Sequence, residues 1–200
     1  MRFSIIIPSF LGAYRNSAQN REQKIIRAIN SVLGQTFEDF EVIVIADGCK
    51  TTVDIVKQYD DPRVRHFFIP KAKMWAGEPR NKGLTEAKGE FMTYLDIDDM
   101  FGENHLQSLN DKLNGYDWIW FDDIRYMPKL KQWYQNPCNV AKIGMCGTSN
   151  ICHKKLDVVW NHDGYAHDYY FIEQLRNYKN FAKVDAGEYY VAHLPGVYDL

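Results

Sequence analysis

The segment GEFMTYLDIDD (residues 89–99) decides the fold class, because an apolar run ends there in a group of acidic residues. Residues 91–95 predict a strand buried on both faces. Asp96, Asp98 and Asp99 follow at once. Side chains alternate in an extended segment, so Asp96 and Asp98 are expected on the same side of the chain. Ligands of open α/β sheets bind beyond the carboxyl ends of strands, which makes this segment the first candidate site.

Strands and helices are predicted to alternate before that segment. The stretches that predict strands are residues 3–7, which form a mostly apolar run, and residues 41–46 and 64–69. The stretches that predict helices are residues 21–33, 51–59 and 79–87, the last opening on Pro79 as its first helical residue. This alternation predicts right-handed crossovers, and therefore an α/β fold with a mostly parallel central sheet and helices on both faces.

The second half of the chain is less regular. Residues 117–127 predict an aromatic-rich strand, residues 167–178 a helix, and residues 181–185 and 189–192 two short strands. No internal repeat, low-complexity segment or linker separates the two halves. We therefore expect a single domain over residues 1–200, an ordinary length for one hydrophobic core.

Composition excludes several classes of protein. A net charge of −2 without long runs of one sign gives no general attraction to nucleic acid or anionic membranes. No stretch approaches the roughly 20 apolar residues of a membrane-spanning helix, and no signal-peptide pattern follows the N-terminus. Cys49, Cys138, Cys146 and Cys152 include no C-x-x-C pair, and a metal site of Cys146, Cys152 and His153 fits no common spacing. We expect free thiols and a cytoplasmic protein.

The paired carboxylates admit two interpretations. Two carboxylates that converge at a sheet edge repel each other unless a cation or hydrogen-bond donors lie between them. Mg²⁺ and Mn²⁺ prefer carboxylate oxygens and keep coordination positions open for phosphate oxygens. The alternative is structural, with Asp98 or Asp99 capping a helix that begins near Glu103.

Several segments together carry a family resemblance. They occur in this order: SIIIPSF (4–10), AINSVLGQTFEDFEVIVIADG (28–48), DPRV (61–64), EPRNKGLTEAKGEFMTYLDIDD (78–99), HDYYF (167–171) and YVAHLPG (190–196). The chain resembles the inverting glycosyltransferases of family 2, which have the GT-A fold, a Rossmann-like α/β architecture. The likeness is strong over residues 3–106 and patchier beyond. It implies a nucleotide-sugar-binding half (1–100) and an acceptor-binding half (101–200).

The resemblance also implies roles for individual residues. Those that would contact the nucleotide-sugar, with UDP favoured as the nucleotide, are Pro8, Ser9, Asp47, Arg80, Asn81 and Asp96. Asp98 and the late His193 would bind Mn²⁺ or Mg²⁺, and Asp168 would be the catalytic base. The family often has an acidic residue before the base, where this chain has His167, so Asp163 remains a rival.

The implied chemistry is the transfer of a sugar to an acceptor hydroxyl. A metal would neutralise the charge that grows on the leaving diphosphate, and a carboxylate would take the acceptor proton. The sequence does not identify the acceptor, for which glycans, lipid-linked carriers and other hydroxyl compounds are the alternatives, and self-association into a homo-oligomer is a further expectation. Structural roles are the alternatives for single residues: a helix cap for Asp168, a surface charge for Arg80, a turn for Asp47 and a buried histidine for His193.

Two other functions compete with glycosyl transfer. A module that kept the fold and lost turnover would bind nucleotide-sugars without reaction. A nucleotidyltransferase would need a glycine-rich basic phosphate loop after the first strand, and residues 9–20 offer only Gly12 and Arg15.

Overall fold

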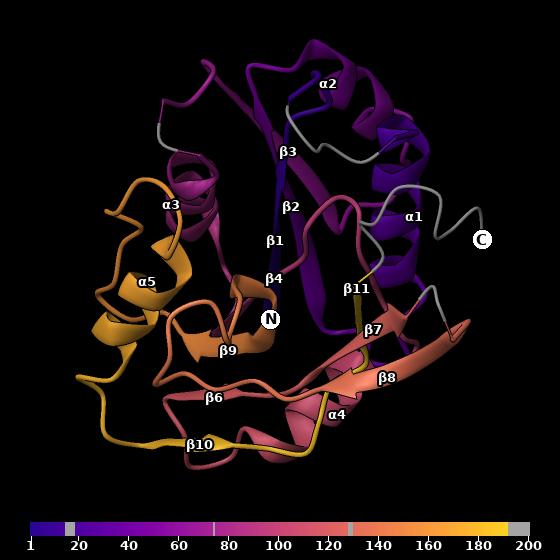
Figure 1. Cartoon of the computed structure of the whole chain (residues 1–200). Helices are drawn as coiled ribbons and strands as arrows, with labels where there is room; N and C mark the ends of the chain where they lie inside the picture. The colour runs from indigo at the N-terminus through magenta and orange to yellow at the C-terminus, as the bar shows by residue number, and fades with distance from the viewer. Residues whose placement is uncertain (15–18, 74, 128–129, 192–200) are drawn as a thin grey trace.

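The computed structural model describes residues 1–14, 19–73, 75–127 and 130–191, and a seven-stranded sheet runs through its centre in the order β10-β6-β9-β4-β1-β2-β3 (Figure 1). Its strands are β1 (Phe3–Ser9), β2 (Phe40–Asp47), β3 (Val64–Ile69), β4 (Phe91–Tyr94), β6 (Trp118–Trp120), β9 (Ile151–Lys154) and β10 (Phe181–Lys183). Strands β3, β2, β1 and β4 are parallel, whereas β9 is antiparallel to both β4 and β6. The predicted mostly parallel α/β sheet is confirmed.

A smaller four-stranded sheet lies beside the first, in the order β5-β11-β7-β8. Its strands are β5 (Met100–Phe101), β7 (Asp123–Met127), β8 (Gln132–Asn136) and β11 (Tyr189–Val191). β7 and β8 form an antiparallel hairpin that projects from one side of the molecule (Figure 1). The stretch predicted as one strand over residues 117–127 is therefore two strands, one in each sheet. Because β5 follows β4 directly, the acidic segment lies at the junction of the two sheets.

Helices cover both faces of the central sheet, as the alternation predicted. They are α1 (Arg21–Leu33), α2 (Lys50–Val56), α3 (Gly77–Glu86), α4 (His105–Lys112) and α5 (His167–Leu175), with a 3-10 turn η1 (Thr148–Asn150). α1 lies on one side of β1 and β2, and α3 and α5 lie on the other (Figure 1).

Alternation along β1 and β2 supplies both hydrophobic cores. Ile5 faces the core under α1, whereas its neighbour Ile6 faces the core shared with α5. α1 contributes Ile25 and Ile29 to the first core, and α5 contributes Phe171 to the second. Full burial of each such side chain stabilises the fold by roughly 1.5–3 kcal/mol, so the two cores hold the carboxyl edge of the sheet in place.

Several boundaries differ from the sequence prediction: α5, for example, ends at Leu175 instead of residue 178, and β10 ends at Lys183 instead of residue 185. α3 begins at Gly77, so Pro79 is its third residue rather than its first. Proline is tolerated there because the first four helical N–H groups have no partner within the helix. α2 ends at Val56, before the predicted end at residue 59. The next two residues form a turn in which Gln58 N–H donates to the carbonyl of Ile55.

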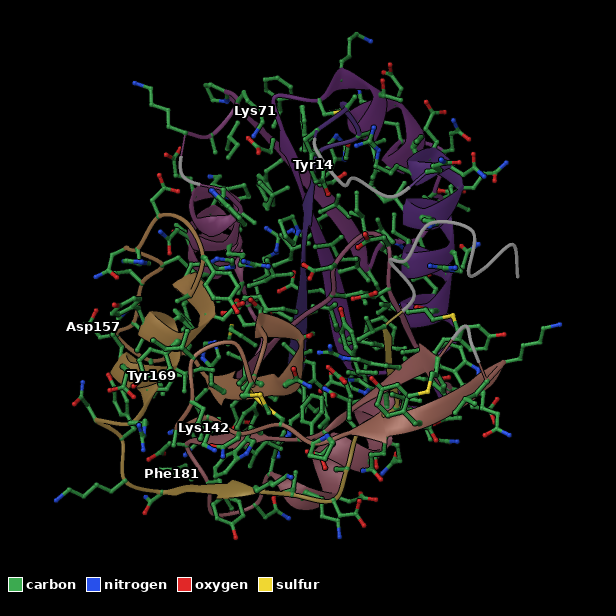
Figure 2. The ribbon with its side chains drawn as sticks, in the orientation of Figure 1. Tyr14, Lys71, Lys142, Asp157, Tyr169 and Phe181 are labelled. Atoms are coloured by element: carbon green, nitrogen blue, oxygen red, sulfur yellow. A yellow bond between two sulfur atoms is a disulfide. The ribbon has the colours of Figure 1, made fainter. Side chains whose placement is uncertain are left out.

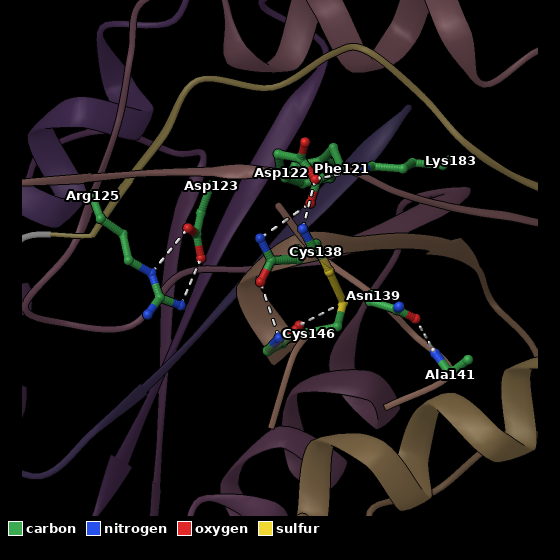
Figure 3. The surroundings of a disulfide bond; sticks show 11 residues. Phe121, Asp122, Asp123, Arg125, Cys138, Asn139, Ala141, Cys146 and Lys183 are labelled. Atoms are coloured by element: carbon green, nitrogen blue, oxygen red, sulfur yellow. Dashed lines mark hydrogen bonds and ion pairs between the residues drawn. A yellow bond between two sulfur atoms is a disulfide. The ribbon is translucent and has the colours of Figure 1, made fainter. Parts of the chain in front are cut away.

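The expectation of free thiols is wrong for two of the four cysteines. Cys138 and Cys146 form a disulfide with a Cα–Cα distance of 4.8 Å (Figure 3). Turns bring them together, since Asn139 N–H donates to the carbonyl of Met145 at 2.7 Å. Cys49 and Cys152 are free and buried, and Cys152 points into the core under α1. Sequence spacing alone does not show such a reversal of the chain.

No helix in the described part of the chain combines the length and apolar character needed to cross a bilayer.

Candidate active site

A cavity of about 970 Å³ opens at the carboxyl ends of β1, β2 and β4. That volume suits a ligand of nucleotide-sugar size. Seven of the predicted site residues line it: Pro8, Ser9, Asp47, Arg80, Asp96, Asp98 and Asp168. Asp168 comes from α5, far along the chain from the others, so the fold brings together residues that only the family resemblance had connected.

The carboxyl-terminal residues of β1 and β2 form one side of the cavity. Asp47 is buried, and its carboxylate accepts hydrogen bonds from the backbone N–H of Ala72 at 2.5 Å and from Lys71 Nζ at 2.6 Å. Figure 2 shows Lys71 and Tyr14 at this end of the sheet. Ser9 is fixed by a buried hydrogen bond of 2.8 Å between its hydroxyl and that of Thr52. Asp47 therefore holds a loop as well as lining the cavity.

Arg80 lies between the two ends of the cavity. Its side chain is 5% exposed, which makes the alternative of a surface charge on α3 wrong. Nη2 donates to Asp96 Oδ1 at 3.1 Å, and Nη1 lies 3.1 Å from His167 Nε2. The guanidinium also lies over the ring of Trp160, 4.8 Å from its centroid. These contacts hold a fixed positive charge against the cavity wall.

Asn81 is not among the residues that line the cavity. Its side chain forms two hydrogen bonds of 2.8 Å with the backbone N–H and carbonyl of Trp160. Because Trp160 packs against Arg80, Asn81 supports the ring beneath the arginine.

All three aspartates of the acidic segment line the cavity, with Asp96 and Asp98 half-exposed and Asp99 buried, where it accepts a hydrogen bond of 2.8 Å from the Tyr189 hydroxyl. The segment is not extended as predicted: residues 97 and 98 form a turn in which Asp99 N–H donates to the carbonyl of Asp96 at 3.1 Å. The capping alternative is wrong, because α4 begins at His105 with Asn104 before it and no side chain caps it.

The donor set at this edge fits a hard divalent cation. Within residues 1–14, 19–73, 75–127 and 130–191, no group of three or more His, Cys, Asp or Glu side chains is placed to hold a metal. His193, the predicted third ligand, lies outside the described residues. Mg²⁺ is often held by one or two carboxylates together with substrate phosphates, and Asp96 and Asp98 supply two carboxylates beside an open cavity.

Asp168 is the second residue of α5, and its carboxylate faces the cavity instead of capping the helix. Oδ1 accepts a hydrogen bond from the Thr148 hydroxyl and lies 3.1 Å from His167 Nε2. Burial acts to raise the pKa of Asp168, but the hydrogen bond from His167 and the charge of Arg80 outweigh it and leave the pKa below its usual value. The carboxylate is therefore ionised at neutral pH, as a base must be. Asp163, its rival, is exposed and does not line the cavity.

His167 contacts both Asp168 and Arg80 through one nitrogen. Nδ1 lies 3.0 Å from the carbonyl of Gly164, which assigns a proton to Nδ1. Nε2 then accepts from Arg80 when the ring is neutral, or donates to Asp168 when it is protonated. Burial acts to lower the pKa of His167, but Asp168 more than compensates and the pKa is raised. The sequence showed His167 only as a departure from a family pattern and gave no indication of Thr148.

The fold and cavity define a class: an α/β protein of GT-A architecture with an open cavity at the carboxyl edge of its sheet, into which several aspartates and one ionised carboxylate from α5 face. The family model for glycosyl transferase family 2 matches residues 4–175. The chain belongs to that family, which confirms the prediction from sequence.

Two curated relatives and one group of solved structures illustrate the similarity. The chain is 35% identical over 119 residues to GalNAc(5)-diNAcBac-PP-undecaprenol beta-1,3-glucosyltransferase of Campylobacter jejuni, which covers 58% of this chain and 36% of that protein. It is 34% identical over 113 residues to poly(ribitol-phosphate) beta-N-acetylglucosaminyltransferase TarP of Staphylococcus aureus, covering 54% and 32%. The crystal structure of S. aureus TarS 1–349 superposes with a TM-score of 0.76 at 20% identity, covering 96% and 60%. TarS has also been solved with UDP and with UDP-GlcNAc. The matched region spans about a third of each curated relative.

Proposed function

We propose that this protein transfers a sugar from a UDP-sugar to an acceptor hydroxyl with inversion at the anomeric carbon, assisted by Mn²⁺ or Mg²⁺. One observation carries the proposal: a single cavity contains Asp96 and Asp98 on one wall and the ionised Asp168 on another, with Arg80 between them. The TarS complexes support the choice of UDP, and the relatives named for glucosyl and N-acetylglucosaminyl transfer support a hexose or N-acetylhexosamine donor.

The donor would bind along the carboxyl edge of the sheet. Pro8, Ser9 and Asp47 would contact the nucleoside, and Asp96 the ribose. Asp98, with His193 and Asp96 as further candidate ligands, would hold a cation that neutralises charge on the departing diphosphate. Arg80 would hold its guanidinium near the phosphates, where two parallel N–H groups suit phosphate oxygens.

The acceptor would react beside Asp168. Its hydroxyl gives its proton to the carboxylate while the oxygen forms a bond to the anomeric carbon. The bond from that carbon to the diphosphate breaks, and the diphosphate keeps the electron pair. Attack opposite the leaving group inverts the anomeric centre, the geometry of an inverting glycosidase with the acceptor in place of water. Thr148 and His167 keep the carboxylate oriented.

A lipid-linked glycan is one acceptor class to test first, because the C. jejuni relative is named for an undecaprenol-linked glycan. Cytoplasmic location and self-association stay predictions. A non-catalytic nucleotide-sugar-binding module is the competing function. The orientation of Asp168 into the cavity argues against it, since binding alone has no use for an ionised base. A nucleotidyltransferase is disfavoured because residues 9–20 supply only Gly12 and Arg15 toward a phosphate loop.

Release of UDP from a panel of UDP-sugars, with Mn²⁺ and after exhaustive chelation, tests the proposal. Asp168→Asn should lower kcat by about 10²–10⁴-fold and leave UDP affinity unchanged, because only the base is lost. Asp98→Ala should lose both activity and Mn²⁺-dependent UDP binding. Asp163→Asn, a matched exposed aspartate outside the cavity, should behave like the wild type. Normal turnover by Asp168→Asn would refute the base assignment, and full activity after chelation would refute the metal.

A further inference from the structure

Trp75 stands out because it combines a strained backbone with a large ring that is exposed to solvent at the cavity. Its ring is 59% exposed, although Trp118 and Trp160 are buried and Trp120 and Trp133 are half-buried. Its backbone also has a φ of +25°, in the left-handed region that favours glycine. A strained backbone is unfavourable for folding, and strain of this kind gathers at functional sites, whereas the exposed ring gains no burial from the fold.

The ring of Trp75 lies at the end of the cavity that contains the base. Trp75 lines the cavity, and its ring centroid is 5.8 Å from that of His167, tilted by 50°. His167 Nε2 is in turn 3.1 Å from Asp168 Oδ1. One side chain therefore separates the exposed ring from the carboxylate that would take the acceptor proton.

We propose that Trp75 is a stacking platform for a pyranose ring of the acceptor, an inference that rests on the proposed function. A flat indole packs against the apolar C–H face of a sugar, and the polar edge of that sugar stays free for hydrogen bonds. A sugar stacked on Trp75 points a hydroxyl toward Asp168. The acceptor's chemical class is thus a saccharide whose reacting ring lies flat at the cavity mouth.

The position of Trp75 favours the acceptor over the nucleoside as its partner. Asp47 and Lys71 mark the nucleoside end, whereas Trp75 packs against α5, the helix that carries the base. Trp160, the second tryptophan near the base, cannot serve as the platform because both faces of its ring are in use, by Phe171 stacked at 4.0 Å and by Arg80. The platform therefore lies on the acceptor side of Asp168.

Steady-state kinetics separates an acceptor role from a donor role. The probes are the UDP-sugar that the wild type turns over and a panel of 4-nitrophenyl monosaccharide glycosides, of which the best acceptor is used. Trp75→Ala should raise the acceptor KM on the order of 10-fold and leave the donor KM and acceptor-free donor hydrolysis within about twofold. Trp75→Phe should retain most of the affinity, because a flat ring remains. Phe68→Ala, which removes a 56% exposed ring on β3 outside the cavity, should match the wild type.

The outcomes distinguish this inference from the proposed function. An unchanged acceptor KM in Trp75→Ala, or a rise confined to the donor KM, overturns the platform. Donor hydrolysis without transfer to any glycoside of the panel overturns a saccharide acceptor at this place. Failure of the wild type to bind UDP or release it from any UDP-sugar overturns the proposed function instead.

Discussion

Two buried histidines should make this protein sensitive to mild acid. His153 lies in β9 with no exposed surface, and both ring nitrogens are used in the neutral form. Its Nδ1–H donates to the Lys154 carbonyl at 2.6 Å, and its Nε2 accepts from the Tyr94 hydroxyl at 2.8 Å. Burial lowers the pKa of His153 to about 4, and burial lowers that of His105 to about 3.

The magnitude follows from proton linkage. Below the unfolded-state pKa of 6.5, the unfolded chain binds a proton at each histidine, while the folded protein stays neutral until about pH 4 for His153 and about pH 3 for His105. Stability is therefore lost as the pH falls through this window. Each histidine should remove roughly 2 kcal/mol between pH 7 and pH 5, a large part of the roughly 5–15 kcal/mol of an ordinary domain.

Urea unfolding at pH 7 and at pH 5 measures the effect. His153→Gln retains an acceptor for Tyr94 and a donor for the Lys154 carbonyl but cannot titrate. Its loss of unfolding free energy between the two pH values should be smaller than that of the wild type by roughly 2 kcal/mol. Groups that titrate in both proteins, including His167, cancel in this difference. Equal losses in the two proteins would show that His153 is not held neutral by burial.

The remaining predictions concern the cavity and the disulfide. Arg80→Met should lower kcat/KM by about 10–100-fold, and Arg80→Lys should restore it only in part, because lysine lacks the planar fork. Loss of this charge should also raise the pKa of Asp168, so the acid limb of the pH–rate profile should move to higher pH. An acid limb at the same pH in the variant and the wild type would contradict an effect of Arg80 on Asp168. Cys138→Ser should lower the unfolding free energy by roughly 2–3 kcal/mol, the loop-closure effect for cysteines separated by 8 residues. Dithiothreitol should produce the same loss in the wild type and none in the variant.

The sequence predicts residues 1–100 better than the rest of the chain. Short runs of β-branched apolar residues such as 42–45 are typical of a strand covered on both faces, so β2 and its neighbours follow from local sequence. Asp96 and Asp98 could be placed at the carboxyl edge because they follow a buried strand directly, although a turn and not the predicted alternation brings them to the cavity. The Cys138–Cys146 disulfide and the contact between Thr148 and Asp168 depend on turns that bring distant residues together, and no local pattern encodes them. Asn81 shows that a residue that matches a family motif can have a different position. Its side chain forms a hydrogen bond with the backbone of Trp160 and is not among the residues that line the cavity.

The antiparallel pairing of β4 with β9 sets the distance across the cavity between the acidic segment and Thr148. The acidic segment follows the carboxyl end of β4, and Thr148 precedes the amino end of β9, so both meet at one edge with Thr93 opposite Cys152. A slip of two residues in this register would move one side of the cavity past the other by about 7 Å, farther than any side-chain rearrangement could correct. Engineering of new acceptor preferences should therefore graft loops outside this strand pair and leave its alignment untouched.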